Sequence, residues 1–330
     1  YGFMKKQRIL VCGASGFIGK NIFERLSKRT DLDVYGTYFK NRALASSPPN
    51  PKIWRVDFTD RNSALKLTAG FDCIIHASAL TQGLGVVNSR PTFYIADNLI
   101  MNTNIAEAVL VNKIPHLIFM SCSVVYADSP LPQREGEVDL DLIHPQYFMG
   151  ARIKLLMEDL CQFYSQHCHL RFTMIRHSNI YGPYDKFDLE KGHVFAATIK
   201  KVVSTKDGDE IIIWGRGHEK RDFLYVSDLV DFIETIVETA AMKEFAPQFT
   251  ILNVGSETGI SVSELVKRIV KISGKNIRIK YDPTKPSLGN CIVLDCGKAR
   301  KMTGWQAKVD LNQGIRQTID WHIENENYVT

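Results

Sequence analysis

Long apolar segments, clustered cysteines and leader-like segments are all missing from this sequence. No apolar run approaches the ~20 residues that a membrane-spanning helix needs, so no membrane partner is expected. The seven cysteines are scattered and odd in number. None forms a Cys-x-x-Cys or Cys/His pattern, which argues against a metal site and favours reduced thiols. Because no signal-peptide pattern is seen, the protein is expected in the cytoplasm.

An excess of charge of one sign is missing too. The formal net charge is only +5, and the basic residues are interspersed with acidic ones. A nucleic-acid-binding protein usually carries a basic stripe, so nucleic acid is not an expected partner. A modest positive balance suits a small phosphate-bearing ligand. The 330 residues, 45% hydrophobic and 23% charged, are typical of a globular chain with one large domain or two intimate ones.

A glycine-rich segment follows the first expected strand. Residues 6–12 end in four apolar residues, which is typical of a buried parallel strand, and a helical pattern begins after residue 16. Gly13 permits a tight turn, Gly16 lets the backbone approach a pyrophosphate, and Gly19 permits close packing of helix on strand. The helix N-terminus favours the phosphate charge. The expected dinucleotide-binding residues here are Gly13, Ser15, Gly16, Phe17, Ile18 and Gly19.

Strand and helix patterns then alternate along the chain. Further strands are predicted over residues 33–38, 53–56, 71–77, 116–121 and 172–176, and helices between them include residues 98–111 and 153–165. Strands that alternate with helices imply a parallel, doubly wound α/β sheet, the Rossmann architecture.

The choice of cofactor can be read after the second strand. An NAD enzyme usually places Asp or Glu there to hold the ribose 2′-hydroxyl. This chain instead has Tyr38, Lys40 and Arg42, and the two cations suit a 2′-phosphate, unless both are simply solvated loop charges. NADP is therefore favoured, with NAD as the alternative. Asp57, followed by Phe58, is positioned to meet the adenine amino group.

Three further motifs resemble those of the extended short-chain dehydrogenase/reductase family. They are residues 76–79 beside the cofactor phosphates and ribose, residues 97–99 at the central helix, and residues 121–126 at the end of the active-site strand. The resemblance covers nearly the whole chain. It implies a nucleotide-binding domain over residues 1–180 and a smaller, mainly substrate-binding α/β domain over residues 181–330, with a strand near 250–255 returning to the first. The further cofactor contacts that it implies are Ala77, Ser78, Ala79, Asn98, Lys154 and His177.

The tyrosine that this family uses for proton transfer is missing. In the family a tyrosine and a lysine lie one helical turn apart, and the tyrosine exchanges a proton with the sugar oxygen as hydride moves. Lys154 fits the lysine, which leaves Gly150 at the tyrosine position, and Tyr147 is about two turns from the lysine. Three explanations stay open. A water fills the space at Gly150, a hydroxyl such as Tyr126 or Tyr184 moves in, or Gly150 is an engineered change.

The neighbouring catalytic positions are altered as well. The serine or threonine position of the family is Cys122, and Ser121 flanks it. Within the family, the GDP-L-fucose synthases pair a cysteine with a histidine for epimerisation at C3 and C5. His193 matches that histidine, but Val124 stands at the cysteine position and cannot move a proton. The resemblance therefore implies hydride transfer at C4 without the full double epimerisation.

The second half of the chain is similar to the substrate-binding half of the GDP-L-fucose synthases. The similar segments are residues 179–189, 192–194, 213–217 and 221–226. Arg221 can fork onto diphosphate oxygens, Lys201 offers a point charge unless it is solvated, and Trp214 can pack on a sugar or base unless it is core. The expected substrate-binding residues are Asn179, His193, Val194, Lys201, Trp214 and Arg221.

The sequence is accordingly expected to encode an NADP-dependent oxidoreductase acting at C4 of a GDP-linked keto-hexose or heptose, in the synthesis of deoxy or otherwise modified sugars. Ser121, Cys122, Lys154 and His193 would surround the vacant position at Gly150. The family's helix pairing implies a homodimer. Two alternatives remain open: an epimerase that retains its cofactor, and a regulatory protein that binds NADP(H) without turnover.

Overall fold

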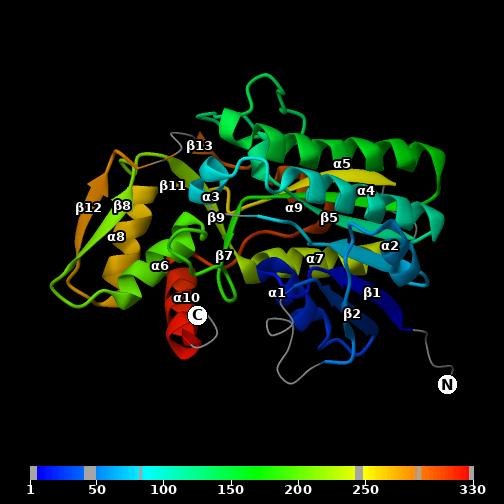
Figure 1. Ribbon diagram of the computed structural model, residues 1–330, viewed down its shortest axis with the longest axis horizontal. Coiled ribbons are helices and arrows are strands. Elements are labelled where there is room, and N and C mark those ends of the chain that lie inside the picture. The colour runs from blue at the N-terminus through cyan, green and yellow to red at the C-terminus, as the bar shows by residue number, and fades with distance from the viewer. Residues whose placement is uncertain are drawn as a thin grey trace.

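The computed structural model describes residues 6–40, 50–81, 84–241, 248–285, 287 and 291–326. Within these ranges seven strands form one parallel sheet in the order β10-β6-β5-β4-β1-β2-β3 (Figure 1). The sheet is the predicted doubly wound α/β architecture, and the six strands predicted in the first half are confirmed to within two residues at each end. The bounds are β1 Gln7–Cys12, β2 Leu32–Tyr38, β3 Ile53–Arg55, β4 Cys73–His76, β5 His116–Cys122, β6 Arg171–His177 and β10 Phe249–Val254.

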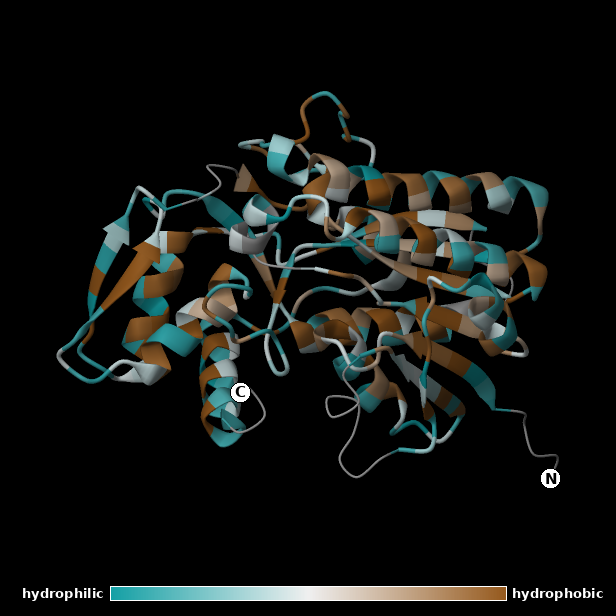
Figure 2. Cartoon of the chain, in the orientation of Figure 1, coloured by the Kyte–Doolittle hydropathy of each residue, from teal (hydrophilic) through white to brown (hydrophobic). Residues whose placement is uncertain are grey.

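Helices cover both faces of this sheet, so its central strands are buried on both sides. α1 (Phe17–Leu26) and α7 (Val226–Ala241) lie on one face, while α2 (Arg61–Thr68), α4 (Ile95–Val111) and α5 (Phe148–His167) lie on the other (Figure 1). Figure 2 shows the central strands largely in the apolar colour. α4 and α5 both begin earlier than predicted, because residues 95–97 and 148–152 lack a clear apolar period.

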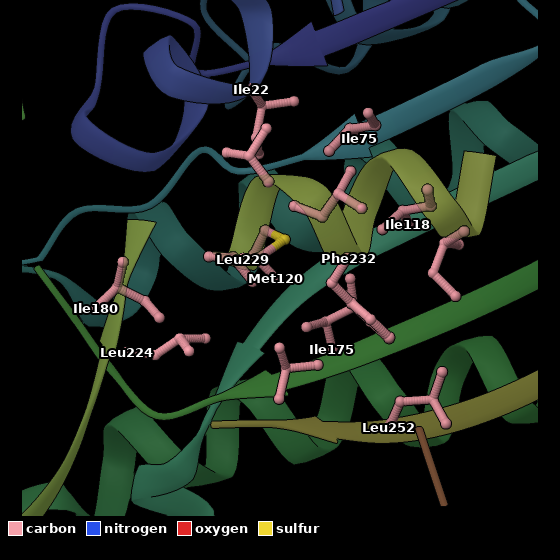
Figure 3. Packing of buried hydrophobic residues seen from close by; sticks show 14 of the residues in the cluster. Ile22, Ile75, Ile118, Met120, Ile175, Ile180, Leu224, Leu229, Phe232 and Leu252 are labelled. Carbon is pink, nitrogen blue, oxygen red and sulfur yellow. The ribbon is translucent and has the colours of Figure 1, made fainter. Parts of the chain in front are cut away.

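A continuous apolar core fills the space between the sheet and the first pair of helices. Ile22 of α1 and Phe232 of α7 meet Ile75, Ile118 and Ile175 of three neighbouring strands (Figure 3). Each of these five side chains is completely buried. This packing fixes the carboxyl ends of β1, β4, β5 and β6 at one edge of the sheet.

A second lobe stands beside that edge. β7 (Asn179–Tyr181), β11 (Gly259–Ser261) and β13 (Cys291–Ile292) pair with β9 (Lys220–Tyr225), and β8 (Glu210–Trp214) pairs with β12 (Arg278–Asp282). α6 (Val194–Ser204), α8 (Val262–Ser273) and α10 (Leu311–Glu324) pack around the core of this lobe. Between its segments the chain returns to the large sheet, where β10 pairs in parallel with β6 and α9 (Gly297–Thr303) contacts β10.

A buried ion pair ties α5 to the sheet. The Glu158 carboxylate on α5 lies 2.5 Å from the Arg176 guanidinium on β6, and both side chains are at most 4% exposed. The Ser121 hydroxyl on β5 donates to the same carboxylate at 2.6 Å. Arg176 also donates to the Tyr126 hydroxyl at 3.0 Å, and Tyr126 donates to Asn253 of β10 at 2.7 Å. One polar network therefore joins α5, β5, β6 and β10.

Across the part of the chain that is described, no helix is long and apolar enough to cross a membrane.

Replacing Glu158 by Gln is expected to lower the free energy of unfolding by roughly 3–5 kcal/mol, because it leaves the Arg176 charge buried without a counter-ion. Urea unfolding followed by circular dichroism measures this loss. Glu107→Gln is the matched control, since the Glu107–Arg61 pair joins α2 and α4 at the surface, where water screens it. Equal losses in the two variants would show that the buried pair does not hold α5.

Candidate active site

The glycine-rich loop forms an open cradle between β1 and α1. Gly13 has a φ of 84°, and a β-carbon there would lie 2.9 Å from the backbone of Ser78. A β-carbon at Gly19 would collide with the Gly13 carbonyl group. Gly16 is the N-cap of α1 and places no side chain over its first turn. The backbone N–H groups at this helix end therefore stay open to an anion, and Ser15, Gly16, Phe17 and Ile18 are all solvent-accessible.

The cradle lies where the sheet reverses its strand order. β1 pairs with β2 on one side and with β4 on the other, and ligands of such sheets bind in the crevice at this point. Ala77, Ser78 and Ala79 follow β4 directly and are accessible there. Asn98 is buried beneath them, where its amide donates to the Leu80 carbonyl at 3.1 Å and accepts from the Leu80 N–H at 2.9 Å. Asn98 thus holds the loop in place, and a dinucleotide pyrophosphate fits the cradle.

The predicted ribose and adenine residues lie at the ends of β2 and β3. Tyr38 ends β2, and the exposed Lys40 follows it, with its ammonium 5.3 Å from the ring centroid of Phe39. Asp57 accepts hydrogen bonds from the N–H and hydroxyl of Thr59 through one carboxylate oxygen, at 2.9 and 2.7 Å. Phe58 is buried next to it. Arg42, the second predicted cation, lies outside the described residues.

Lys154, Cys122 and His177 come together at the carboxyl ends of β5 and β6. The Lys154 ammonium donates to the Met120 carbonyl at 2.6 Å, and burial lowers the pKa of this lysine. Burial raises the pKa of the Cys122 thiol, and the Lys154 charge opposes that shift. His177 stands opposite Cys122 in the sheet register, and burial lowers its pKa to about 4. At neutral pH Cys122 is therefore a thiol and His177 a neutral imidazole.

Three hydroxyl groups that the sequence offers as catalytic candidates are already hydrogen-bonded to other side chains. Ser121, predicted as catalytic, is completely buried and donates to Glu158, because strand alternation turns it away from the face of Cys122. Tyr126 is 1% exposed and engaged with Arg176 and Asn253. The Tyr184 hydroxyl donates to the Glu24 carboxylate of α1 at 3.1 Å.

A small cavity of about 30 Å³ lies between the two lobes. Asn179 donates to the Asp222 carbonyl at 3.0 Å and so joins β7 to β9 beside this cavity. The Nε group of Arg221 is buried and has no hydrogen-bond partner among the described residues. An unsatisfied buried donor of this kind is costly, so it is suited to an incoming acceptor. The cavity is lined by Ser123, Val124, Tyr147, Asn179, Lys220, Arg221 and Ile292.

The remaining predicted substrate residues lie on α6 and β8. His193 is the N-cap of α6 and Val194 is the first residue of that helix. His193 is solvent-exposed, with protein groups crowded around its ring. The partial loss of hydration that results, together with the charges of Arg221 and Lys186, lowers its pKa to about 4. Lys201 donates to the Ile212 carbonyl at 2.6 Å, so its ammonium is already engaged with β8.

Trp214 lies close to the first lobe. It is the last residue of β8 and is half-buried. A β-carbon at Gly85 of α3 (Leu84–Ser89), which precedes α4, would lie 3.5 Å from the indole ring. The tryptophan of the second lobe therefore lies close to α3 of the first lobe.

Two tyrosines were missed as candidates by the sequence reasoning. Tyr147 lies about two turns before Lys154 and was therefore not proposed. It ends the short helix η2 (Pro145–Tyr147) that precedes α5, and it lines the cavity together with residues of η1 (Ser123–Val125). Tyr94 stands before α4, and its hydroxyl would lie 3.7 Å from a β-carbon on residue 150. No spacing rule links residue 94 to residue 150, so only the fold reveals this contact. No group of His, Cys, Asp or Glu that could hold a metal ion is present in the described ranges.

Comparisons with known proteins agree with this geometry. GDP-L-fucose synthase of Escherichia coli (strain K12) is 24% identical over 98% of this chain and 99% of its own length. GDP-L-colitose synthase of Yersinia pseudotuberculosis is 28% identical over 97% of this chain and 99% of its own. The crystal structure of a GDP-6-OMe-4-keto-L-xylo-heptose reductase from C. jejuni has a TM-score of 0.83 at 19% identity. It covers 98% of this chain and 99% of that chain, a likeness of fold.

The family itself follows from a match over most of the chain. Residues 9–255, from β1 to just beyond β10, match the NAD dependent epimerase/dehydratase family. That stretch includes the glycine cradle, the ends of β4, β5 and β6, and α5 with Lys154. The protein is therefore a member of the NAD dependent epimerase/dehydratase family.

Proposed function

We propose that this protein is an NADP-dependent reductase that delivers a hydride to C4 of a GDP-linked 4-keto sugar. The observation that carries the proposal is the cleft between the two lobes. On one side it has Lys154 and Cys122 at the strand ends, and on the other the buried, unsatisfied Arg221 donor. The relatives support the substrate class, since GDP-L-fucose synthase and GDP-L-colitose synthase match over nearly their whole length.

Each lobe has a separate task in this proposal. When bound, the nicotinamide cofactor supplies the hydride. The cradle at Gly13, Gly16 and Gly19 binds its pyrophosphate, and Lys154 holds its ribose close to Cys122 at the end of β5. Arg221 binds the diphosphate of the sugar nucleotide through charge-assisted hydrogen bonds.

Reduction without epimerisation fits the residues beside Cys122. Val124 stands on η1, lines the inter-lobe cavity, and has no proton to give or take. His193 is neutral at pH 7 because its pKa is lowered, so it orients a sugar hydroxyl and does not act as a strong acid. One proton donor and one hydride are enough for a C4 reduction.

We assign the 2′-phosphate of the cofactor to a position beside the cations that follow β2. Lys40 is exposed beside the expected ribose, and no carboxylate follows Tyr38 in the described part of this turn. This arrangement supports NADP, with NAD as the alternative.

A homodimer is proposed from the outer surfaces of α4 and α5. These helices lie side by side on one face of the molecule (Figure 1). Ile100 of α4 and Leu156 and Phe163 of α5 are each at least 43% exposed. Large apolar side chains gathered on paired helices favour a second copy of the same surface.

The proposed reaction is tested by mixing stoichiometric protein with NADPH and a panel of GDP-4-keto sugars while absorbance at 340 nm is followed. A loss of NADPH together with a reduced sugar is the expected result, and UDP-4-keto sugars serve as the control panel. Unchanged absorbance, with both ligands shown to bind, would contradict a reductase. Inversion at C4 without net NADPH loss would indicate an epimerase instead.

Lys154→Met is expected to slow single-turnover reduction by about 10²-fold or more, because both the ribose contact and the cationic charge are lost. The rate is measured by stopped flow with saturating NADPH. Lys66→Met, on the surface of α2, is the matched control and should react like the unaltered protein. Equal rates in the two variants would remove Lys154 from the mechanism.

Lys40→Ser is expected to weaken NADPH binding by roughly fivefold and to leave NADH binding unchanged, because an exposed cation on a phosphate contributes modestly. Fluorescence titration measures both dissociation constants. Lys52→Ser is the control, since that nearby exposed ammonium is paired with Asp33. An equal loss for NADPH and NADH would contradict a 2′-phosphate contact at Lys40.

A further inference from the structure

Among the described residues outside α5, one side chain borders the space at Gly150. Gly150 lies in the first turn of α5, one helical turn before Lys154 on the same face. Outside α5 itself, the described atoms within 4 Å of a β-carbon at this position both belong to Tyr94. The hydroxyl oxygen would lie at 3.7 Å and the nearest ring carbon at 3.9 Å. A side chain on residue 150 would therefore point toward the Tyr94 phenol.

The Tyr94 hydroxyl keeps its proton available. Tyr94 ends the loop before α4, and its ring packs edge-on against Phe93 with the centroids 5.2 Å apart. In the described part of the chain no side chain is hydrogen-bonded to the hydroxyl. Burial of the ring raises the pKa of this phenol, while the Gly150 N–H, which faces the oxygen, acts in the opposite direction. The group is thus a neutral phenol at pH 7 with an unused O–H.

The other tyrosines near the cleft are less suited to this role. Tyr126 and Tyr184 have their hydroxyls engaged with buried or outward-facing partners. Tyr147 lines the inter-lobe cavity with Asn179 and Arg221, on the side where the diphosphate is proposed to bind. Among the described residues outside α5, only Tyr94 lies within 4 Å of a β-carbon at residue 150, where the side chain of the family's tyrosine would begin.

We propose that Tyr94 is the proton donor of this reductase, replacing the tyrosine that residue 150 lacks. The inference rests on the proposed function. As hydride reaches C4, the carbon–oxygen π bond breaks and a C–H bond forms. The sugar oxygen takes the Tyr94 proton, directly or through one water in the space beside Gly150. The ketone is reduced, the cofactor is oxidised, and the Tyr94 phenolate regains a proton from solvent.

A proton donor at Tyr94 also explains why residue 150 is a glycine. Glycine weakens a helix relative to alanine, so its presence in the first turn of α5 needs a reason. Glycine leaves free the space that a larger side chain would fill in front of the Tyr94 hydroxyl. Glycine at residue 150 therefore both removes the family's tyrosine and leaves the Tyr94 hydroxyl accessible to the sugar oxygen.

The kinetic test compares single-turnover rates with NADPH and GDP-4-keto-6-deoxy-mannose. Tyr94→Phe is expected to lower the rate by about 10²-fold or more, the usual contribution of a general acid. Tyr164→Phe, near the far end of α5, is the matched control and should stay within about threefold. Adding Gly150→Tyr to the Tyr94→Phe protein should recover at least about tenfold, because a phenol returns beside Lys154. Tyr94→Phe within about threefold of the unaltered protein would overturn the inference.

A second readout needs no turnover. In protein labelled with [¹³Cζ]tyrosine, the Tyr94 resonance is identified by its absence from Tyr94→Phe, and its pKa is measured by NMR. Adding a GDP-4-keto sugar together with the oxidised cofactor should raise that pKa, because the sugar oxygen accepts a hydrogen bond from the neutral phenol. An unchanged pKa with both ligands bound would place Tyr94 out of reach of the sugar oxygen and would overturn the inference.

Failure of the proposed function would look different from failure of this inference. If the unaltered protein binds both ligands but oxidises no NADPH, the reductase proposal fails, and the assignment of Tyr94 fails with it. If the unaltered protein turns over and Tyr94→Phe does too, only the assignment of Tyr94 fails. A large loss in Tyr147→Phe with none in Tyr94→Phe would transfer the role to Tyr147.

Discussion

The Glu158 carboxylate and the Arg176 guanidinium meet inside the protein, and the position of α5 depends on their contact. Charges removed from water are stabilised only when they are paired and hydrogen-bonded, and here Ser121 and Tyr126 complete the pairing. Lys154 lies one turn before Glu158, so the same contact sets where its ammonium reaches the end of β5. The Glu158–Arg176 ion pair therefore sets the geometry of the proposed chemistry, although it does not itself contact a ligand.

The parallel sheet supplies the second constraint. Its strands all end at one edge, and its order reverses beside β1, so the glycine cradle, the loop after β4 and the ends of β5 and β6 share one crevice. The second lobe then adds Arg221 and His193 across that crevice. Strand topology thus brings residues that are far apart in the chain into one site. The loops at this edge can carry different catalytic residues while the sheet that holds them stays the same.

Much of this arrangement could be predicted from local sequence. The cradle at Gly13 was predictable because a tight turn and a close helix approach require glycine. β1 and β5 were predictable because each contains the continuous apolar run of a buried parallel strand. Contacts between distant segments could not be predicted in the same way. The sequence places Ser121 beside Cys122, yet alternation sends its hydroxyl into the ion pair. Tyr94 meets Gly150 only because α4 packs against α5.

The most direct test of the account is to follow the fate of the hydride. The protein is incubated with NADPH deuterated at C4 of the nicotinamide, in separate samples for each face, and a GDP-4-keto sugar. The product is then analysed by mass spectrometry and NMR. The account predicts one deuterium at C4 of the sugar from one of the two faces. A reduced sugar without deuterium at C4, or with it at another carbon, would contradict the account.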